Sequence, residues 1–216
     1  FSWNEIHERL QFRGRAVTLR RNYRTTREIS EAATQFMKFS TEGDPESLML
    51  RSAQSGPQPL LLSFESEEEQ TQLAVKFIKQ MSRHLRLKTS SAAILVPSSK
   101  IGKELAEKVA NSGLPCKFMR GNQLDLQSEE VKVLTLSSSK GLEFPIVCIA
   151  GLEKGVFPRL PESEDPGEIA EVMKVARRTL YVGMTRAMRG LMVLYPVKSP
   201  SPLISEMNEQ FWYTGK

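Results

Sequence analysis

Short apolar segments alternate along this chain with longer segments whose apolar residues recur at helical spacing. The segment 92–96, AAILV, is apolar throughout, which is typical of a strand buried on both faces of a parallel sheet. Alternation of strands and helices favours helices layered on a mainly parallel sheet and joined by right-handed crossovers. We therefore predict a layered α/β fold. The expected strands are 16–19, 59–64, 92–96, 114–119, 131–136, 146–152 and 191–195.

Helix starts and hydrophobic stripes place the helices between these strands. Thr25 with Glu28 predicts a capping box, in which each side chain bonds a backbone N–H of the first turn. Ser66 with Glu69 predicts a second capping box. A third helix is expected to start at Ser98 or Ser99 and to stop at Gly113 with Pro115. The predicted buried faces are Ile29, Ala32, Ala33, Phe36 and Met37; then Ala74, Phe77, Ile78, Met81 and Leu85; then Ile101, Leu105 and Val109.

A longer helix is expected over 169–189. Arg178, Val182 and Arg186 lie four residues apart, so we expect both guanidinium groups to project from one face of this helix. Gly183 inside the helix costs about 1 kcal/mol relative to Ala. We therefore predict that another part of the chain packs closely at Gly183.

The composition excludes some classes of protein. No run of about eighteen apolar residues is present, so no transmembrane helix is expected. The polar first residues, FSWNEIHERL, argue against a secretory signal. Because the chain begins with Phe1 rather than Met, we expect it to be a piece of a longer protein. The net charge of +5 leaves nucleic-acid binding and an ordinary basic surface equally open.

Cysteine usage indicates a reducing compartment. Cys116 and Cys148 lie within apolar runs and have no CxxC spacing, as expected for reduced core residues of a cytoplasmic protein. No cluster of His, Cys, Asp or Glu has metal-ligand spacing, so no metal site is predicted.

Two places in the sequence suit an anionic ligand. The segment 131–143, VKVLTLSSSKGLE, passes from an apolar run into hydroxyls, backbone N–H groups and one ammonium, and then reaches a carboxylate. We expect it to hold phosphate and sugar where a strand ends, although a Ser/Gly-rich turn is more often only a turn. Tyr23 and Arg24 stand between an expected strand and an expected helix, an exposed position that favours anions.

Three segments, in this order, resemble one family. LRRNYRTTREI (19–29), VLTLSSSKGLEFPIV (133–147) and RRTLYVGMTRA (177–187) are similar to motifs IV, V and VI of the UvrD/Rep-type superfamily 1 DNA helicases. The resemblance implies the second RecA-like motor domain of such an enzyme, a three-layer domain over 16–200. Residues 1–15 would then be a connector from an upstream motor domain, and 201–216 a C-terminal helix or tail.

The resemblance also implies roles in binding and hydrolysing ATP. Tyr23 would stack on the adenine ring, and Glu143 would bond a ribose hydroxyl. Gly141 would let the backbone come close to the nucleotide. Arg24 and Arg186 would both reach the γ-phosphate, a task that suits the planar and permanently charged guanidinium.

A second set of implied roles concerns DNA and the rest of the enzyme. Thr135, Ser137 and Ser138 would lie against the backbone of single-stranded DNA. The sequence has no GxxxxGK[ST] phosphate loop, and no apolar strand ends in a paired-acid DE dipeptide. ATP and its Mg²⁺ would therefore be held mostly by the upstream motor domain, and the isolated chain should be inactive.

The chain also departs from the family pattern. Ser137 stands where the family usually has His, and 96–99 lacks the usual Arg/Asn pair. Only about ten residues separate 120 from 131, where many members insert a large regulatory subdomain. The strand order stays open, because the gap 137–145 is short for a parallel crossover.

Two other functions compete with the motor. The chain could be a non-catalytic module that binds nucleic acid or protein and has kept only the fold. A stand-alone dinucleotide-binding domain is disfavoured, because no strand is followed by GxGxxG.

Overall fold

Six parallel strands form the centre of the molecule. The computed structural model describes residues 21–22, 24–38, 51–52, 54–120, 125, 127–161 and 165–215, and within them the main sheet has the order β3-β8-β7-β4-β6-β5. Every pairing in it is parallel, so the predicted α/β fold is confirmed. The strands are β3 (Leu60–Phe64), β4 (Ala92–Val96), β5 (Cys116–Phe118), β6 (Val131–Thr135), β7 (Phe144–Ile149) and β8 (Ala187–Pro196).

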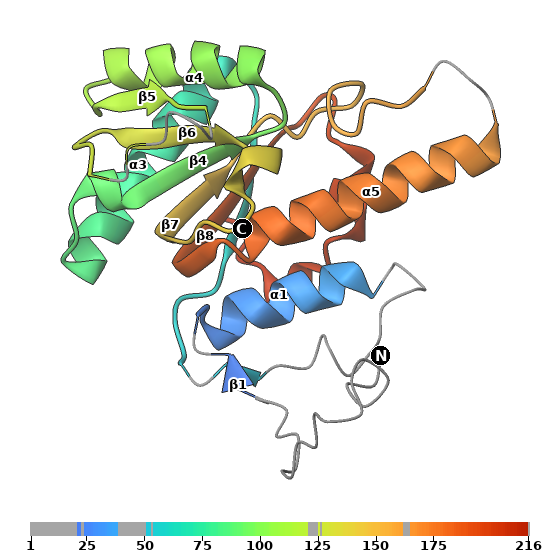
Figure 1. Cartoon of the computed structure of the whole chain (residues 1–216), viewed down its shortest axis with the longest axis horizontal. Coiled ribbons are helices and arrows are strands. Elements are labelled where there is room, and N and C mark those ends of the chain that lie inside the picture. The colour runs from blue at the N-terminus through green and yellow to red at the C-terminus, as the bar shows by residue number, and fades with distance from the viewer. Residues whose placement is uncertain are drawn as a thin grey trace, which may run out of the picture.

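Helices cover both faces of this sheet (Figure 1). α3 (Glu67–Leu85) and α4 (Ser99–Asn111) pack on one face, and α1 (Arg27–Met37) and α5 (Pro166–Met184) pack on the other. Each interface has its own hydrophobic cluster, which makes the three predicted layers. None of the described helices is long and apolar enough to cross a membrane. The clusters include Phe77, Ile78, Leu105 and Val109 on the first face, and Ile29, Phe36, Leu180 and Met184 on the second.

A second, two-stranded parallel sheet lies beside the N-terminal end of α1 (Figure 1). It consists of β1 (Arg21–Asn22) and β2 (Arg51–Ser52). The predicted connector 1–15 and the predicted strand 16–19 lie outside the described residues.

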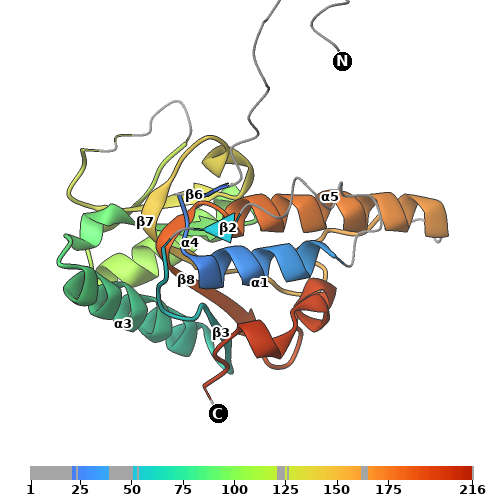
Figure 2. The same cartoon turned by 90° about the horizontal axis from the view of Figure 1, so that it is seen from below.

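The C-terminal segment, expected as a helix or tail over 201–216, packs against the rest of the domain (Figure 2). It forms two short 3-10 helices, η5 (Pro202–Glu206) and η6 (Glu209–Phe211). Leu203 and Trp212 are buried in the same hydrophobic cluster as α1 and α5. This segment therefore extends the second core.

The helix starts agree only in part with the sequence patterns. Ser66 is an N-cap as predicted, and Ser98 is the N-cap of α4, one of the two expected starts, Ser98 or Ser99. Each side chain accepts a hydrogen bond from the N–H three residues on, at 3.2 and 3.4 Å. The capping box at Thr25 and Glu28 is wrong. The N-cap of α1 is Thr26, whose side chain makes no capping bond, and the Glu28 carboxylate bonds a different segment.

The helix predicted over 169–189 is shorter than expected. α5 ends at Met184, and Ala187 begins β8. Arg186 lies in the turn between them, so the prediction that it shares a helix face with Arg178 is wrong. The reason is long-range: Ala187 is fully buried and pairs with the first residue of β7, which overrides local helix propensity.

Residues 136–143, here called the crossover, join two strands that are not neighbours. β4 lies between β6 and β7 and pairs with both, which settles the strand order. Thr135 and Phe144 lie at levels of β4 that are six residues apart, with Phe144 nearer its amino end. Together with the step across two strands, the path from Thr135 to Phe144 is about 22 Å. Nine extended residue steps reach about 30 Å, which is enough. The crossover runs under α5, where a Cβ added to Gly183 would lie 2.5 Å from Cδ2 of Leu136, so the predicted close packing is confirmed.

Candidate functional site

The site residues expected from the sequence lie at two opposite edges of the sheet. Glu143 and Arg186 directly precede β7 and β8, so they stand at the amino ends of these parallel strands. Thr135 ends β6, and the 3-10 helix η4 (Ser137–Ser139) follows it at the carboxyl edge. The expectation that 131–143 lies at one strand end is therefore wrong, because the crossover carries the chain from one edge to the other; that the segment holds phosphate and sugar stays a prediction.

Three expected site residues that are far apart in sequence lie at the amino edge. The Phe144 N–H donates to the Arg186 carbonyl at 2.9 Å, which holds the starts of β7 and β8 side by side. Arg24, in the loop before α1, places Nε 3.0 Å from Oε1 of Glu143. We call Arg24, Glu143 and Arg186 the arginine cluster.

The Arg186 guanidinium is held by oxygens from two elements. Its Nε donates to the Val182 carbonyl at 3.0 Å, and Nη1 donates to the Leu142 carbonyl at 3.1 Å. Nη2 donates to Oγ1 of Thr185 at 3.3 Å. The last turn of α5 and the end of the crossover therefore fix together where this side chain points.

The Arg24–Glu143 ion pair is exposed. The two side chains are 76% and 31% exposed, and pairs in such surroundings contribute only about 0–1 kcal/mol. A ligand that offered phosphate to the arginine or hydroxyls to the carboxylate could therefore replace either partner at small cost. Tyr23, the expected adenine contact, lies outside the described residues.

Gly141 has a backbone reason to be glycine. Its φ is +83°, in the left-handed region that other residues adopt at a cost, and a Cβ built there would meet no atom within 4 Å. The residue therefore serves the turn before Glu143 and leaves open space beside the backbone, which suits an approaching ligand.

At the carboxyl edge, hydroxyl groups order the start of the crossover. The Thr135 hydroxyl donates to Oγ of Ser138 at 2.8 Å, and the Ser138 N–H donates back to Oγ1 of Thr135 at 3.1 Å. The buried Ser139 hydroxyl donates to the Leu136 carbonyl at 2.7 Å. Ser137 is exposed, so of these residues it is the one free to face a ligand.

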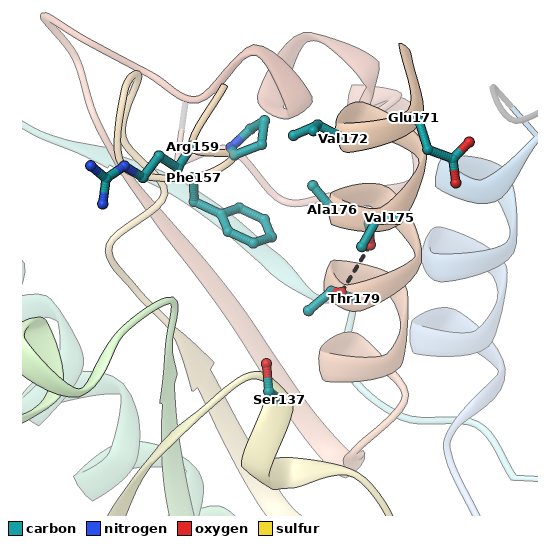
Figure 3. Close-up of a pocket in the computed structure, with 9 residues that line it drawn as sticks. Ser137, Phe157, Arg159, Glu171, Val172, Val175, Ala176 and Thr179 are labelled. Carbon is teal, nitrogen blue, oxygen red and sulfur yellow. Dashed lines mark hydrogen bonds between the residues drawn. The ribbon is translucent and has the colours of Figure 1, made fainter. Parts of the chain in front are cut away.

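Ser137 also lines a pocket of about 310 Å³ between α5 and the loop after β7 (Figure 3). On the loop side, the Phe157 ring turns toward Ala176 and Thr179 of α5, whereas the Arg159 guanidinium points away from the helix at the rim of the pocket. An aromatic ring, a cation and hydroxyls can together stack a base and hold a phosphate. The sequence did not single out Phe157 and Arg159, because their segment is rich in Pro, Gly and acidic residues and carries no motif.

The described part of the chain offers no cluster suited to a metal ion. No group of three or more His, Cys, Asp or Glu residues comes together there. The arginine cluster, with two cations and one carboxylate, fits the phosphates and sugar of a nucleotide but does not fit Mg²⁺.

Comparison with known sequences identifies the family of the chain. The sequence model of the UvrD-like helicase C-terminal domain matches residues 17–124 and 119–198. DNA helicase II of Escherichia coli (strain K12) is 44% identical over 73 residues, which are 34% of this chain and 10% of that protein. The ATP-dependent DNA helicase PcrA of Bacillus subtilis (strain 168) is 43% identical over 72 residues, 31% of this chain and 9% of the relative. The matches thus span about a tenth of the length of these relatives.

A solved structure supports the fold. The C-terminal domain of a possible DNA helicase from Lactobacillus plantarum WCFS1 superposes with a TM-score of 0.63 and 20% identity. The superposition covers 90% of this chain and 99% of that one. At this identity the likeness shows the α/β architecture alone.

Proposed function

Because the chain belongs to the UvrD-like helicase C-terminal domain family, we propose that it is the second motor domain of an ATP-dependent DNA helicase or translocase. The observation that carries the proposal is the gathering of Arg24, Glu143 and Arg186 at one edge of the sheet. Two guanidinium groups and a carboxylate at one edge suit the phosphates and ribose of a nucleotide in a half-site.

In this function each member of the arginine cluster has a distinct task. Arg24 and Arg186 neutralise charge on the γ-phosphoryl oxygens during transfer, and Glu143 bonds a ribose hydroxyl beside the open backbone at Gly141. Tyr23 stacks on the adenine. The phosphate loop and the Mg²⁺ site belong to the upstream motor domain, so the isolated chain would not hydrolyse ATP.

Hydrolysis would then depend on closure of two domains. The nucleotide is held mainly by the upstream motor domain, while the arginines arrive from this one. Charge stabilisation is complete only when the cleft closes, which ties turnover to movement.

The carboxyl edge would form part of the track for single-stranded DNA. Thr135, Ser137 and Ser138 offer neutral hydrogen bonds to the DNA backbone, and the adjoining pocket adds Phe157 and Arg159. Such contacts are largely independent of sequence, and affinity should fall with salt. The parent protein would work on DNA in the cytoplasm.

Replacing one arginine tests the proposal. In the full-length protein that contains this chain, Arg186→Ala should lower DNA-stimulated ATP turnover by about 10³-fold or more while single-stranded DNA binding persists. The matched control is Arg178→Ala, which removes an exposed arginine of α5 and should leave turnover within about twofold. Unchanged turnover in Arg186→Ala would refute the γ-phosphate role, and full-length protein without any nucleotide hydrolysis would favour a binding module.

A further inference from the structure

The carboxylate of Glu28 binds a segment remote in sequence instead of capping its own helix. Oε2 accepts a hydrogen bond from the Gly56 N–H at 2.7 Å, and Oε1 accepts one from the Ser55 hydroxyl at 2.5 Å. The Glu28 side chain is only 20% exposed. It therefore fastens the segment between β2 and β3 to the first turn of α1 (Figure 1).

Residues 54–56 are here called the strap. They contact the start of α1. The Arg27 N–H donates to the Gln54 carbonyl at 2.8 Å, which adds a backbone link beside the Glu28 contacts. Gly56 touches Thr26 so closely that a Cβ there would lie 2.5 Å from Cγ2 of Thr26. The strap therefore fixes one side of the N-cap residue.

On its other side, Thr26 is bound to β8. Its N–H donates to the Met188 carbonyl of β8 at 3.2 Å, two residues beyond Arg186. Arg24 precedes Thr26 by two residues. The N-cap is thus held between the strap and β8, and this docking sets where the Arg24 backbone stands relative to Arg186.

We propose that Glu28 is a positioning residue for Arg24, acting through the strap and the N-cap of α1. The inference rests on the proposed role of Arg24 at the γ-phosphate. Catalysis by an arginine depends on its placement, and a displacement of about 1 Å can cost about 100-fold in rate. Nothing in the proposal requires Glu28 to touch the nucleotide.

Glu28 holds the strap in its ionised form. Burial works against the charge, but hydrogen bonds from Ser55, from its own backbone and from Gly56, with Arg27, outweigh it and lower the pKa of Glu28. The carboxylate is therefore ionised at neutral pH and offers an acceptor to both strap donors.

Substitutions of Glu28 in the full-length protein test the idea. Glu28→Ala removes both acceptors, and Glu28→Gln keeps a single acceptor oxygen in a side chain of the same size. We expect kcat for ATP to fall about 10- to 100-fold in Glu28→Ala and less in Glu28→Gln, with KM within about twofold. The control is Glu31→Ala, an exposed glutamate of the same helix, which should leave kcat unchanged.

A double-mutant cycle separates positioning from general destabilisation. If Glu28 acts through Arg24, Glu28→Ala should cause no further loss in protein that already carries Arg24→Ala. Unchanged kcat in Glu28→Ala, or a loss that adds fully to that of Arg24→Ala, would overturn this inference alone. Full turnover in Arg24→Ala would overturn the proposed function and this inference with it. If Glu28→Ala does not fold, the same cycle with Glu28→Gln decides.

Discussion

Gly183→Ala should destabilise the domain even though alanine is the better helix former. Gly183 lies in α5 directly above the crossover, and an added Cβ would stand 2.5 Å from Cδ2 of Leu136. The next nearest atoms, on Ile149 and Leu95, are at 3.6 and 3.7 Å, so the conflict involves one neighbour. Leu136 is 2% exposed and enclosed by the core, which leaves it little room to move away.

Two opposing terms set the size of the effect. Replacing glycine by alanine inside a helix contributes about 1 kcal/mol of stability. Forcing an extra methyl into a packed core costs about 1–3 kcal/mol. The expected change in the free energy of unfolding of Gly183→Ala is therefore a loss of about 0–2 kcal/mol.

Urea unfolding of the chain, followed by circular dichroism, measures this difference. In a Leu136→Ala background the conflict disappears, so Gly183→Ala should there become stabilising, by up to about 1 kcal/mol. The control is Gly190→Ala, where the added Cβ would also lie close to a side-chain atom, 2.7 Å from Cε of Met81. Met81 is flexible and only partly buried, so its end can move away and relieve the contact. Stabilisation of the otherwise unchanged chain by about 1 kcal/mol in Gly183→Ala would refute the packing argument.

Three further outcomes are expected. Arg177→Ala should lower the free energy of unfolding, measured in urea, by about 2–4 kcal/mol. Arg177 donates two hydrogen bonds of 2.6 and 2.7 Å to the Glu206 carboxylate, which is 17% exposed, and the substitution leaves this carboxylate without them. Burial raises the pKa of Cys116 to about 12 and raises that of Cys148 further. Near pH 8 a thiol reagent should therefore label both cysteines only as fast as the chain unfolds. Rapid labelling would contradict their burial. Because its pKa is lowered in the folded state, the Glu28 carboxylate stabilises the fold at neutral pH, and this contribution is lost as the pH falls below the ordinary pKa of 4.5. In Glu28→Gln the free energy of unfolding should therefore depend less on pH below 4.5.

Elements set by local signals could be predicted from the sequence, and those set by distant partners could not. Ser66 and Ser98 start their helices because a serine hydroxyl accepts a backbone N–H three residues away. The end of α5 could not be predicted in this way, because Ala187 joins a strand whose pairing partner, Phe144, is 43 residues earlier. Helical spacing over 178–186 carries no information about that pairing.

Glu28 shows the same limit at the level of a side chain. Its spacing from Thr25 fits a capping box, yet the carboxylate bonds Ser55 and Gly56, 27 and 28 residues away. Lys132 is a second case: it follows Val131 in an apolar strand, where a lysine is ordinarily exposed. It is 2% exposed, and its ammonium donates to the carbonyls of Ser90 and Ser128 at 2.7 and 2.8 Å.

The structure places three of the expected site residues near one another but divides the expected segment 131–143 between two edges of the sheet. Arg24, Glu143 and Arg186 were expected to serve one nucleotide; the structure puts these three residues at one edge of the sheet, and their role stays a prediction. Sequence analysis assigned the segment 131–143 to the end of a strand, and only the strand order shows that Glu143 lies at the opposite edge from Thr135. That order depends on which strand lies between β6 and β7, and nothing within the segment encodes it.

The crossover has little slack, and this gives the two edges a physical connection. Its path is about 22 Å, and η4 shortens its reach from about 30 Å to about 26 Å. A shift of Ser137 at the carboxyl edge that exceeds this difference of about 4 Å must therefore move the far end of the segment. There the Leu142 carbonyl holds the Arg186 guanidinium, and the next residue, Glu143, pairs with Arg24. A ligand that displaces Ser137 by more than this should consequently alter the geometry of both arginines, whereas a longer connection would separate the two events.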